Sequence, residues 1–401
     1  MLAPMPRALT PALLLLALGQ TVAWSALYYL FAALLLPWER STGWSKPDIA
    51  LALTLALLAS GLISPLIGRL IDRGHGPLLM GAGTALGGLI VACLPFAESL
   101  TTFQVLWVLI GICQAASLYE PCFALLSRAM GPEARRGITL ITLIAGFASA
   151  LSFGGASLLV GWGGWEMAAH LFGMAACLIA APASYLGARL LQSPPNRPSS
   201  PEGTNPETPL PATDPAFLLV AAAFPLMALN HGILVNHLLP ILDERGVPSA
   251  LAVLAASLIG PMQVAGRAVL MLAGGRLASL GLTMVSFAGV AVATLLLLAS
   301  GATPGLILAA VTLQGATYGL ISILKPVVIT ELLGQAGIAR ILGWMALPYL
   351  IGFAAAPYLG ALIWSIGGYG AVLTMTTGFA MGGLLALALA ARLRRRRSLQ
   401  P

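Results

Sequence analysis

The chain has 401 residues, of which 59% are hydrophobic and only 8% are charged. Soluble domains carry about 25% charged residues, so this composition excludes a water-soluble globular protein and, with so much apolar sequence, a solvated disordered chain. The 20 Lys and Arg residues exceed the 13 Asp and Glu residues, but five of the arginines lie between positions 392 and 397. We interpret the excess as a sign of membrane topology, with no nucleic-acid partner. The chain is predicted to be a polytopic membrane protein in contact with the lipid bilayer.

A membrane-spanning helix needs about 20 mostly apolar residues, because the hydrocarbon core of a bilayer is roughly 30 Å thick. Apolar runs of this length, separated by polar or helix-breaking clusters, predict twelve transmembrane helices. The first run greatly exceeds the roughly 7 to 15 residues of a signal-peptide core, so we expect a retained helix. The expected ranges are 10–36, 48–71, 78–97, 102–127, 137–161, 167–190, 215–241, 249–273, 281–300, 304–330, 341–365 and 371–391.

The positions of the basic residues predict the orientation of these helices. With the N-terminus inside, the inner segments hold 15 of the 20 Lys and Arg residues, and the outer loops hold only Arg40, Lys46 and Arg245. The positive-inside rule therefore predicts that both termini are cytoplasmic. Arg greatly outnumbers Lys, a coding bias from which we expect a bacterial protein of the inner membrane.

The domain organisation is predicted from one long polar stretch. Residues 191–214 are rich in Pro, Ser and Thr and predict a flexible cytoplasmic linker between six-helix bundles at 1–190 and 215–391, with a basic tail at 392–401. An internal repeat supports this division, because four short matches recur in the same order at offsets of 204 to 207 residues. They pair Thr10-Pro11-Ala12 with Asp214-Pro215-Ala216, Gly68-Arg69-Leu70 with Gly275-Arg276-Leu277, Glu120-Pro121 with Lys325-Pro326, and Gly163-Gly164-Trp165 with Gly367-Gly368-Tyr369.

The run Gly68-Arg69-Leu70-Ile71-Asp72-Arg73, between the second and third predicted helices, resembles the G-x-L-x-D-R signature of the major facilitator superfamily. Two six-helix halves joined by a long inner loop resemble the same family. The resemblance implies an all-α membrane protein with twelve transmembrane helices in two pseudo-symmetric six-helix bundles. It also implies a gating role for Gly68, Asp72 and Arg73. The sequence departs from the family pattern after Arg73, where Gly74-His75-Gly76-Pro77 replaces a spaced glycine and two basic residues.

Other local features are similar to the monocarboxylate and oxalate:formate porter branch of that family. They are Gly43-Trp44-Ser45, the pair Arg135-Arg136 and an arginine within the helix 249–273, Arg267. Proton-coupled drug exporters often carry an arginine in the fourth helix and a glycine-proline motif in the fifth, and both are missing here. These features favour the porter branch and leave a drug exporter open.

Three ionisable residues lie clearly inside predicted helices: Glu120, Arg267 and Lys325. Each costs about 2.5 to 3.5 kcal/mol in a membrane, so each is a functional hypothesis. The guanidinium of Arg267 suits a carboxylate, Lys325 is a second cationic contact, and Glu120 is a candidate proton-coupling group. The alternatives are that Arg267 snorkels to the inner surface, or that either cation forms a structural ion pair with Glu120.

Polar side chains repeat at helical spacing, and the resemblance implies that they line a central cavity. His231 could titrate near neutral pH, although a membrane histidine is more often a packing residue. Pro121 and Pro326 are expected to kink their helices at matching places. The polar faces are Gln20, Trp24 and Tyr28 on 10–36; Asn230 and His237 on 215–241; Gly260, Gln263 and Arg267 on 249–273; and Gln314, Tyr318 and Lys325 on 304–330.

We therefore predict a secondary active transporter, not an enzyme, that moves a small organic anion such as a monocarboxylate by alternating access. A proton is the expected coupling ion, no cofactor or metal is expected, and the protein is expected to be a monomer. The four cysteines form no metal-binding motif and no nucleotide-binding loop is present. The alternatives are an exporter of drugs or of metalloids such as arsenicals and, from another class, a membrane enzyme or a transporter-like sensor.

Overall fold

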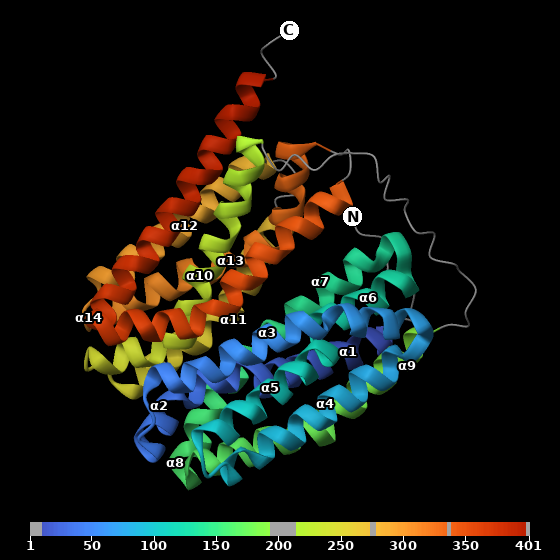
Figure 1. The fold of residues 1–401 in the computed structure, drawn as a ribbon, viewed down its shortest axis with the longest axis vertical. Coiled ribbons are helices and arrows are strands. Elements are labelled where there is room, and N and C mark those ends of the chain that lie inside the picture. The colour runs from blue at the N-terminus through green and yellow to red at the C-terminus, as the bar shows by residue number, and fades with distance from the viewer. Residues whose placement is uncertain (1–9, 193–213, 273–277, 335–337, 398–401) are drawn as a thin grey trace. The chain divides into compact units, whose positions relative to one another are not determined.

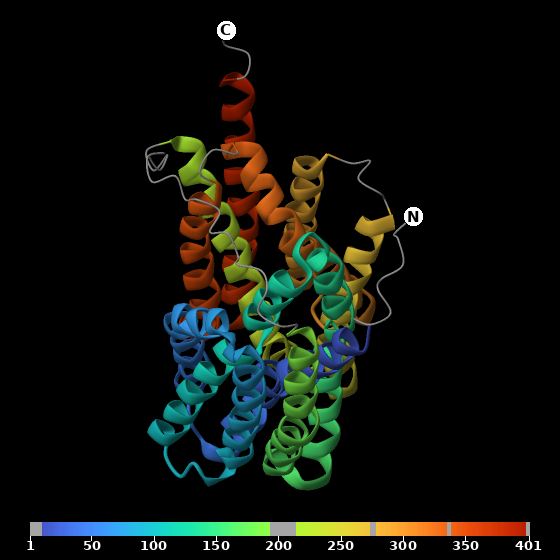
Figure 2. The same cartoon turned by 90° about the vertical axis from the view of Figure 1, so that its right-hand side faces the viewer.

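The computed structural model describes residues 10–192, 214–272, 278–334 and 338–397. The chain divides into two compact units, Met1–Ser199 and Ser200–Pro401, here named unit 1 and unit 2. The described residues of both units are almost entirely helical (Figures 1 and 2). Nearly all of the expected linker lies outside the described residues, as do Arg7, Arg197 and the repeat segment Gly275-Arg276-Leu277.

The described residues of unit 1 form nine α-helices. Three of them are continued by a π-helical turn, at Ser25–Tyr29, Ile71–His75 and Ala176–Ala180. Within this unit α3 packs along α5, and α4 packs along α9. Their bounds are α1 Thr10–Trp24, α2 Leu30–Thr42, α3 Lys46–Leu70, α4 Gly76–Cys93, α5 Leu100–Ser117, α6 Tyr119–Met130, α7 Ala134–Ala145, α8 Ala148–Ala175 and α9 Ala181–Leu191.

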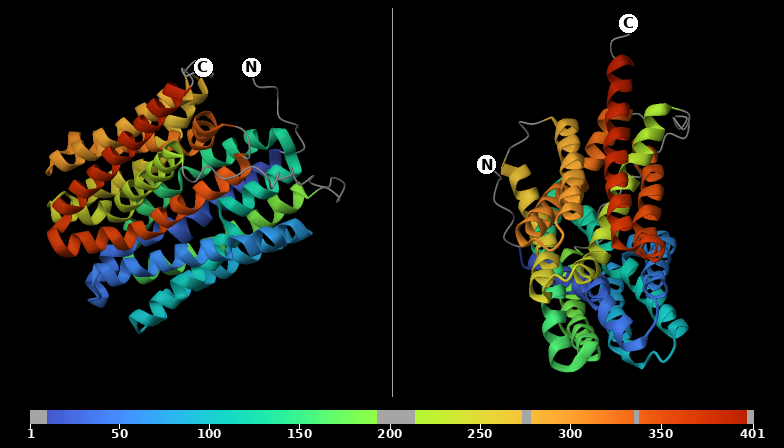
Figure 3. Two further views of the ribbon diagram at one scale, coloured as in Figure 1. Left: turned by 45° about the horizontal axis from the view of Figure 1, so that its top comes forward. Right: turned by 90° about the vertical axis from the view of Figure 1, so that its left-hand side faces the viewer.

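The described residues of unit 2 form five helices, which run roughly side by side in Figure 3. Within it α10 packs along α14, and α13 packs against both α11 and α12. The last helix continues to Arg397, so the first six residues of the expected basic tail are helical. The bounds are α10 Pro215–Glu244, α11 Ser249–Leu272, α12 Ser279–Ala299, α13 Pro304–Leu333 and α14 Ile338–Arg397.

Local sequence explains where several of these helices begin and end. Ser45 caps α3 by accepting a hydrogen bond of 3.2 Å from the amide of Asp48, and Asp214 caps α10 by accepting one of 2.9 Å from the amide of Ala216. A proline follows each cap within two residues, where its missing N–H costs nothing. Helix α2 ends at Gly43, whose φ of 72° is the left-handed conformation that glycine adopts most easily.

Nine helical segments in the described residues are long and apolar enough to cross a membrane. Three of them, Lys46–Phe96, Ala134–Leu191 and Ile341–Arg395, contain 51, 58 and 55 residues. A single crossing needs only about 20 residues. Each of the three is interrupted by glycine in a non-helical conformation, at Gly74, at Gly163 and Gly164, and at Gly367 and Gly368.

The two double-glycine interruptions have the same geometry, 204 residues apart. Gly163 and Gly367 have φ and ψ of −156° and 28° and of −146° and 19°, and Gly164 and Gly368 follow with φ of 78° and 66°. Only glycine reaches the second conformation readily, since its φ is positive and its ψ is close to 180°. At this turn the two repeat segments share their backbone conformation as well as their glycines.

The backbone differs around Pro121 and Pro326, the two prolines expected to kink their helices at matching places. In unit 1 the chain leaves helical geometry at Leu118, with φ and ψ of −83° and −153°, which separates α5 from α6. In unit 2 the single helix α13 continues through Pro326. Proline removes only one backbone hydrogen bond, so a helix held by its neighbours can absorb it.

Candidate functional site

Six polar or aromatic side chains of unit 2 meet in one continuous group, here named the unit 2 cluster. They come from four helices, and five of the six are residues that the sequence singles out. The members are His231 on α10, Gln263 and Arg267 on α11, Tyr318 and Lys325 on α13, and Tyr349 on α14.

Glycine allows the helices that carry this cluster to approach closely. A methyl group at Gly319 of α13 would lie 2.5 to 3.0 Å from backbone atoms of Gln263, and one at Gly266 of α11 would overlap the carbonyl of Ala316. Larger residues at either position would push α11 and α13 apart. The sequence therefore brings the backbone of α13 within hydrogen-bonding reach of side chains on α11.

Arg267 is at the α11 end of the cluster. Its Nε donates a hydrogen bond of 3.2 Å to the carbonyl of Gly319, and its Nη2 lies 3.4 Å from Oε1 of Gln263. Only 9% of the residue is exposed. These contacts hold the guanidinium beside α13. They show that the long side chain lies among helices of unit 2, which the sequence could not distinguish from snorkelling.

His231 and Tyr318 form the centre of the cluster. Their rings stack with centroids 3.5 Å apart and an interplanar angle of 12°. Nε2 of His231 lies 3.4 Å from Nε2 of Gln263, and the buried Nδ1 has no hydrogen-bond partner among the described residues. Because Gln263 also accepts from Arg267, the amide joins the imidazole to the guanidinium.

Tyr349 joins this centre to Lys325. The hydroxyls of Tyr318 and Tyr349 are 3.0 Å apart, and Nζ of Lys325 lies 3.6 Å from the centroid of the Tyr349 ring. Sequence reasoning missed Tyr349, because the helix that carries it shows no polar face beside it. Cation–π contacts of this kind hold an ammonium near a ring without neutralising its charge.

Asn230 and Gln314, two other predicted site residues, lie in a separate network inside unit 2. Nε2 of Gln314 donates to Oδ1 of Asn230 at 2.9 Å, and Nδ2 of Asn230 donates to Thr294 Oγ1 and to the Thr376 carbonyl at 3.0 and 2.9 Å. Asn230 is fully buried and Gln314 is 4% exposed. The expected continuous stripe of Gln314, Tyr318 and Lys325 is thus divided between two networks, because each amide finds its partner on a neighbouring helix.

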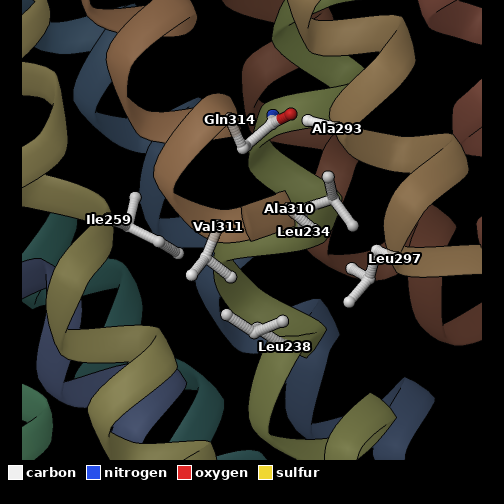
Figure 4. Close-up of a pocket in the computed structure, with 8 residues that line it drawn as sticks. All are labelled: Leu234, Leu238, Ile259, Ala293, Leu297, Ala310, Val311 and Gln314. Carbon is white, nitrogen blue, oxygen red and sulfur yellow. The ribbon is translucent and has the colours of Figure 1, made fainter. Parts of the chain in front are cut away.

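Gln314 also borders an otherwise apolar cavity of unit 2 (Figure 4). His237, expected on the same face as Asn230, lies apart from the cavity lining. Its Nε2 is 2.8 Å from the carbonyl of Pro357, and its Nδ1 is 3.3 Å from the hydroxyl of Tyr369. The other cavity-lining residues are Leu234, Leu238, Ile259, Ala293, Leu297, Ala310 and Val311.

In unit 1, the side chain of Gln20 forms a hydrogen bond with the backbone of a neighbouring helix. It is fully buried, and its Nε2 donates a hydrogen bond of 2.7 Å to the carbonyl of Ser117. In a regular helix that carbonyl would accept from the residue four positions later, but this residue is Pro121, which has no N–H. Gln20 therefore satisfies the carbonyl that the proline leaves free.

Trp24 and Tyr28 belong to an aromatic group of unit 1 that also includes Tyr29 and Tyr119. The ring of Trp24 lies 5.3, 6.3 and 4.7 Å from those of Tyr28, Tyr29 and Tyr119. Tyr28 is buried, whereas Trp24, Tyr29 and Tyr119 are half-buried. Glu120 follows Tyr119 in the first turn of α6, where the helix dipole favours a carboxylate, and its side chain is exposed.

The predicted gating residues lie at the turn between α3 and α4. Gly68 is in the last turns of α3, while Asp72 and Arg73 lie in the π-helical turn Ile71–His75 and are exposed. Asp72 forms an ion pair of 2.8 Å with Arg128 near the end of α6, and Arg128 also donates to the carbonyl of Ile71 at 3.3 Å. Arg128 is one of the 15 basic residues that predict the orientation, and nothing in the sequence indicates that it pairs with Asp72.

Among the described residues, no group of three or more His, Cys, Asp or Glu side chains could hold a metal ion, and Cys93, Cys113, Cys122 and Cys177 are free thiols. Long apolar helices in both units are typical of a polytopic membrane protein. A family model described as Major Facilitator Superfamily matches residues 13–285. The chain belongs to this family, so it is a membrane transporter and not an enzyme.

Similar solved structures agree with this fold. The chain is similar to two crystal structures of a bacterial homologue of the human lysosomal transporter Spinster, one inward-facing and occupied and the other inward-facing and unoccupied. Sequence identity is 16% and 17%, TM-scores are 0.65 and 0.62, and each match covers 98% of this chain and 98% and 97% of the other. No curated protein sequence matches the chain.

Proposed function

We propose that this secondary transporter moves a small organic anion, such as a monocarboxylate, by alternating access. The observation that carries the proposal is the unit 2 cluster, in which Arg267 and Lys325 stand at two ends of one chain of contacting side chains. Guanidinium offers a fork of donors that matches a carboxylate, and ammonium adds a second positive charge. The phenol hydroxyls and the imidazole between them supply further hydrogen-bonding groups.

The proposed architecture is twelve crossings in two pseudo-symmetric six-helix bundles. Counting both arms of the three interrupted spans, as their length requires, adds three crossings to the nine candidates and makes twelve. The matching double-glycine turns support the pseudo-symmetry. We further propose a monomer in a bacterial inner membrane with both termini cytoplasmic, on the distribution of Arg and Lys.

Membership of the monocarboxylate and oxalate:formate porter branch is part of the proposal. Arg267 on α11 supports it, because this residue is buried among unit 2 helices and bonded to α13. For coupling we propose a proton carried by Glu120, an exposed carboxylate inside a membrane span. Gly68, Asp72 and Arg73 are proposed to gate, with Arg128 as the partner of Asp72.

Uptake and efflux in proteoliposomes test the substrate class. The purified protein is reconstituted with an imposed pH gradient and supplied with monocarboxylates, dicarboxylates, neutral solutes and organic cations. We expect saturable transport of monocarboxylates, with Arg267→Ala greatly reduced and Arg135→Ala, an exposed arginine of α7, unchanged. Transport of cations alone, or full activity of Arg267→Ala, would overturn the proposal.

A drug or metalloid exporter is the second candidate. The aromatic group of Trp24, Tyr28, Tyr29 and Tyr119 beside the exposed Glu120 favours it, because such surfaces bind organic cations. Cys113 and Cys122 would be the thiols available to an arsenical, and both are buried. Deletion of the gene distinguishes the candidates: toxicant sensitivity indicates export, and loss of growth on an organic acid indicates uptake.

A further inference from the structure

The last helix of unit 2 extends past its apolar sequence. The apolar run of α14 ends at Ala391, yet the helix continues through Arg392, Leu393 and four consecutive arginines to Arg397. At about 1.5 Å per residue, these six residues add roughly 9 Å to the helix. The polar headgroup layer on each side of a bilayer is roughly 5 to 8 Å thick. A helix whose apolar run ends at the hydrocarbon boundary therefore carries these arginines through the layer of lipid phosphates.

Two arginines of this segment, Arg392 and Arg394, have no acidic partner in the part of the chain that the structure describes. The sequence contains no Asp or Glu after Glu331, and the side chains of Arg392 and Arg394 are exposed. The guanidinium groups of Arg392 and Arg394 are therefore open to an anion from outside the helix.

The corresponding helix of unit 1 shows that such a run is not required to end a membrane helix. Helix α9 stops at Leu191 and has one basic residue, Arg189, whose Nη1 lies 3.3 Å from the hydroxyl of Tyr185. A single arginine suffices there, whereas α14 has five in six positions. Ending a membrane helix therefore does not explain the five arginines at the end of α14.

We propose that residues 392–397, here named the basic extension, bind the phosphate groups of anionic phospholipids in the leaflet that the end of α14 enters. Guanidinium pairs with phosphate through two parallel hydrogen bonds, and clusters of basic residues next to a membrane helix strengthen binding to anionic lipid. The helical backbone holds the arginines at the headgroup level, so lipid phosphate is at high local concentration there. The proposal is independent of the transported substrate.

Native mass spectrometry of the full chain in detergent tests this, with phosphatidylglycerol and phosphatidylcholine competing for the protein. The wild type should retain phosphatidylglycerol preferentially. The variant with Arg392, Arg394, Arg395, Arg396 and Arg397 all changed to Gln should lose that preference by about tenfold or more, because each basic group near a charged headgroup adds to binding. Changing all five to Lys should keep most of it, since charge is retained.

Two controls separate the basic extension from general effects. Arg135→Gln/Arg136→Gln removes two adjacent arginines of α7 and should leave the lipid preference unchanged. If the five-Gln variant fails to accumulate, Arg392→Gln/Arg394→Gln should still lower the preference, by roughly threefold. Equal retention of the two lipids by the wild type, an unchanged preference in the Gln variants, or displacement of the lipid by inorganic phosphate would each overturn the proposal.

Discussion

Units 1 and 2 use their buried polar side chains in different ways. In unit 1 these side chains bond to irregular backbone: Gln20 donates to the Ser117 carbonyl, Gln114 to the Leu27 carbonyl at 2.6 Å, and Ser152 to the Ser25 carbonyl at 3.0 Å. The last two carbonyls lie in the π-helical turn of the first span. In unit 2, Arg267, Asn230 and His237 also meet backbone carbonyls. Here, however, polar side chains from different helices also contact one another, in the cluster from Arg267 to Lys325 and in the Asn230–Gln314 pair.

This difference teaches that a polar residue in a membrane helix is not by itself a binding residue. An unsatisfied backbone carbonyl is costly in lipid, so every bulge or proline needs a donor from a neighbouring helix. Unit 1 has these irregularities, and its side-chain amides and hydroxyls donate hydrogen bonds to the backbone carbonyls there. Unit 2 keeps α10 and α13 continuous, and polar side chains on these helices, such as His231, Gln314 and Tyr318, contact other side chains.

The largest expected effect comes from Arg267. At the repeat offset of 207 residues, its counterpart in unit 1 is Ser60. Arg267→Ala removes charge-assisted hydrogen bonds worth roughly 3 kcal/mol, so we expect transport efficiency to fall about a hundredfold. Ser60→Ala should change it less than about twofold. Initial uptake rates in proteoliposomes measure both. Equal losses for Arg267→Ala and Ser60→Ala would show that the unit 2 position is no more important for transport than its unit 1 counterpart.

Gln20→Leu tests whether the hydrogen bond from the Gln20 side chain to the Ser117 carbonyl stabilises unit 1. The Ser117 carbonyl would lose its donor while remaining near Pro121, so we expect a loss of roughly 1 to 3 kcal/mol in stability. At the repeat offset of 204 residues, the unit 2 counterpart is Phe224, an apolar residue of a continuous helix. Thermal unfolding in detergent measures the loss. An unchanged midpoint for Gln20→Leu would show that the carbonyl needs no side-chain donor.

The fold was largely predictable from the sequence, because apolar run length determines where helices can cross a membrane. The run 215–241 is observed as α10 Pro215–Glu244, and 304–330 as α13 Pro304–Leu333. The break at Leu118 was not predictable. Glu120-Pro121 and Lys325-Pro326 look alike in sequence, yet the helix is interrupted just before the first pair and continues through the second.

Partners across helices were the least predictable part of the site. Helical spacing groups Gln314 with Tyr318 and Lys325, but it does not specify which neighbouring helix each side chain meets. Gln314 meets Asn230, while Tyr318 meets His231 and Tyr349. These pairings depend on how α11, α13 and α14 are positioned by glycine contacts such as that at Gly319, which periodicity does not show.

Two substitutions of Tyr349 distinguish its hydroxyl contact with Tyr318 from its ring contact with Lys325. Tyr349→Phe keeps the ring beside Lys325 and removes one hydroxyl contact, so we expect transport affinity to fall roughly threefold, the effect of one neutral hydrogen bond. Tyr349→Leu also removes the cation–π contact, worth about 0.5 to 2 kcal/mol, and should cause a further severalfold loss. Competition uptake assays measure both. Identical behaviour of the two variants would mean that the ring does not position Lys325.

The smallest expected effect is at the turn between α3 and α4 in unit 1. Asp72→Asn removes an ion pair with Arg128 whose side chains are 72% and 38% exposed, and exposed pairs contribute at most about 1 kcal/mol. The thermal unfolding midpoint should therefore hardly change, and Arg128→Gln should behave the same way. If the turn gates transport, both variants should change the turnover rate while the unfolding midpoint stays the same. The turnover rate is measured by comparing the rate of substrate exchange with the rate of net uptake. A large loss of stability with normal turnover would show that this contact is structural and would leave unit 1 without a gating role for Asp72.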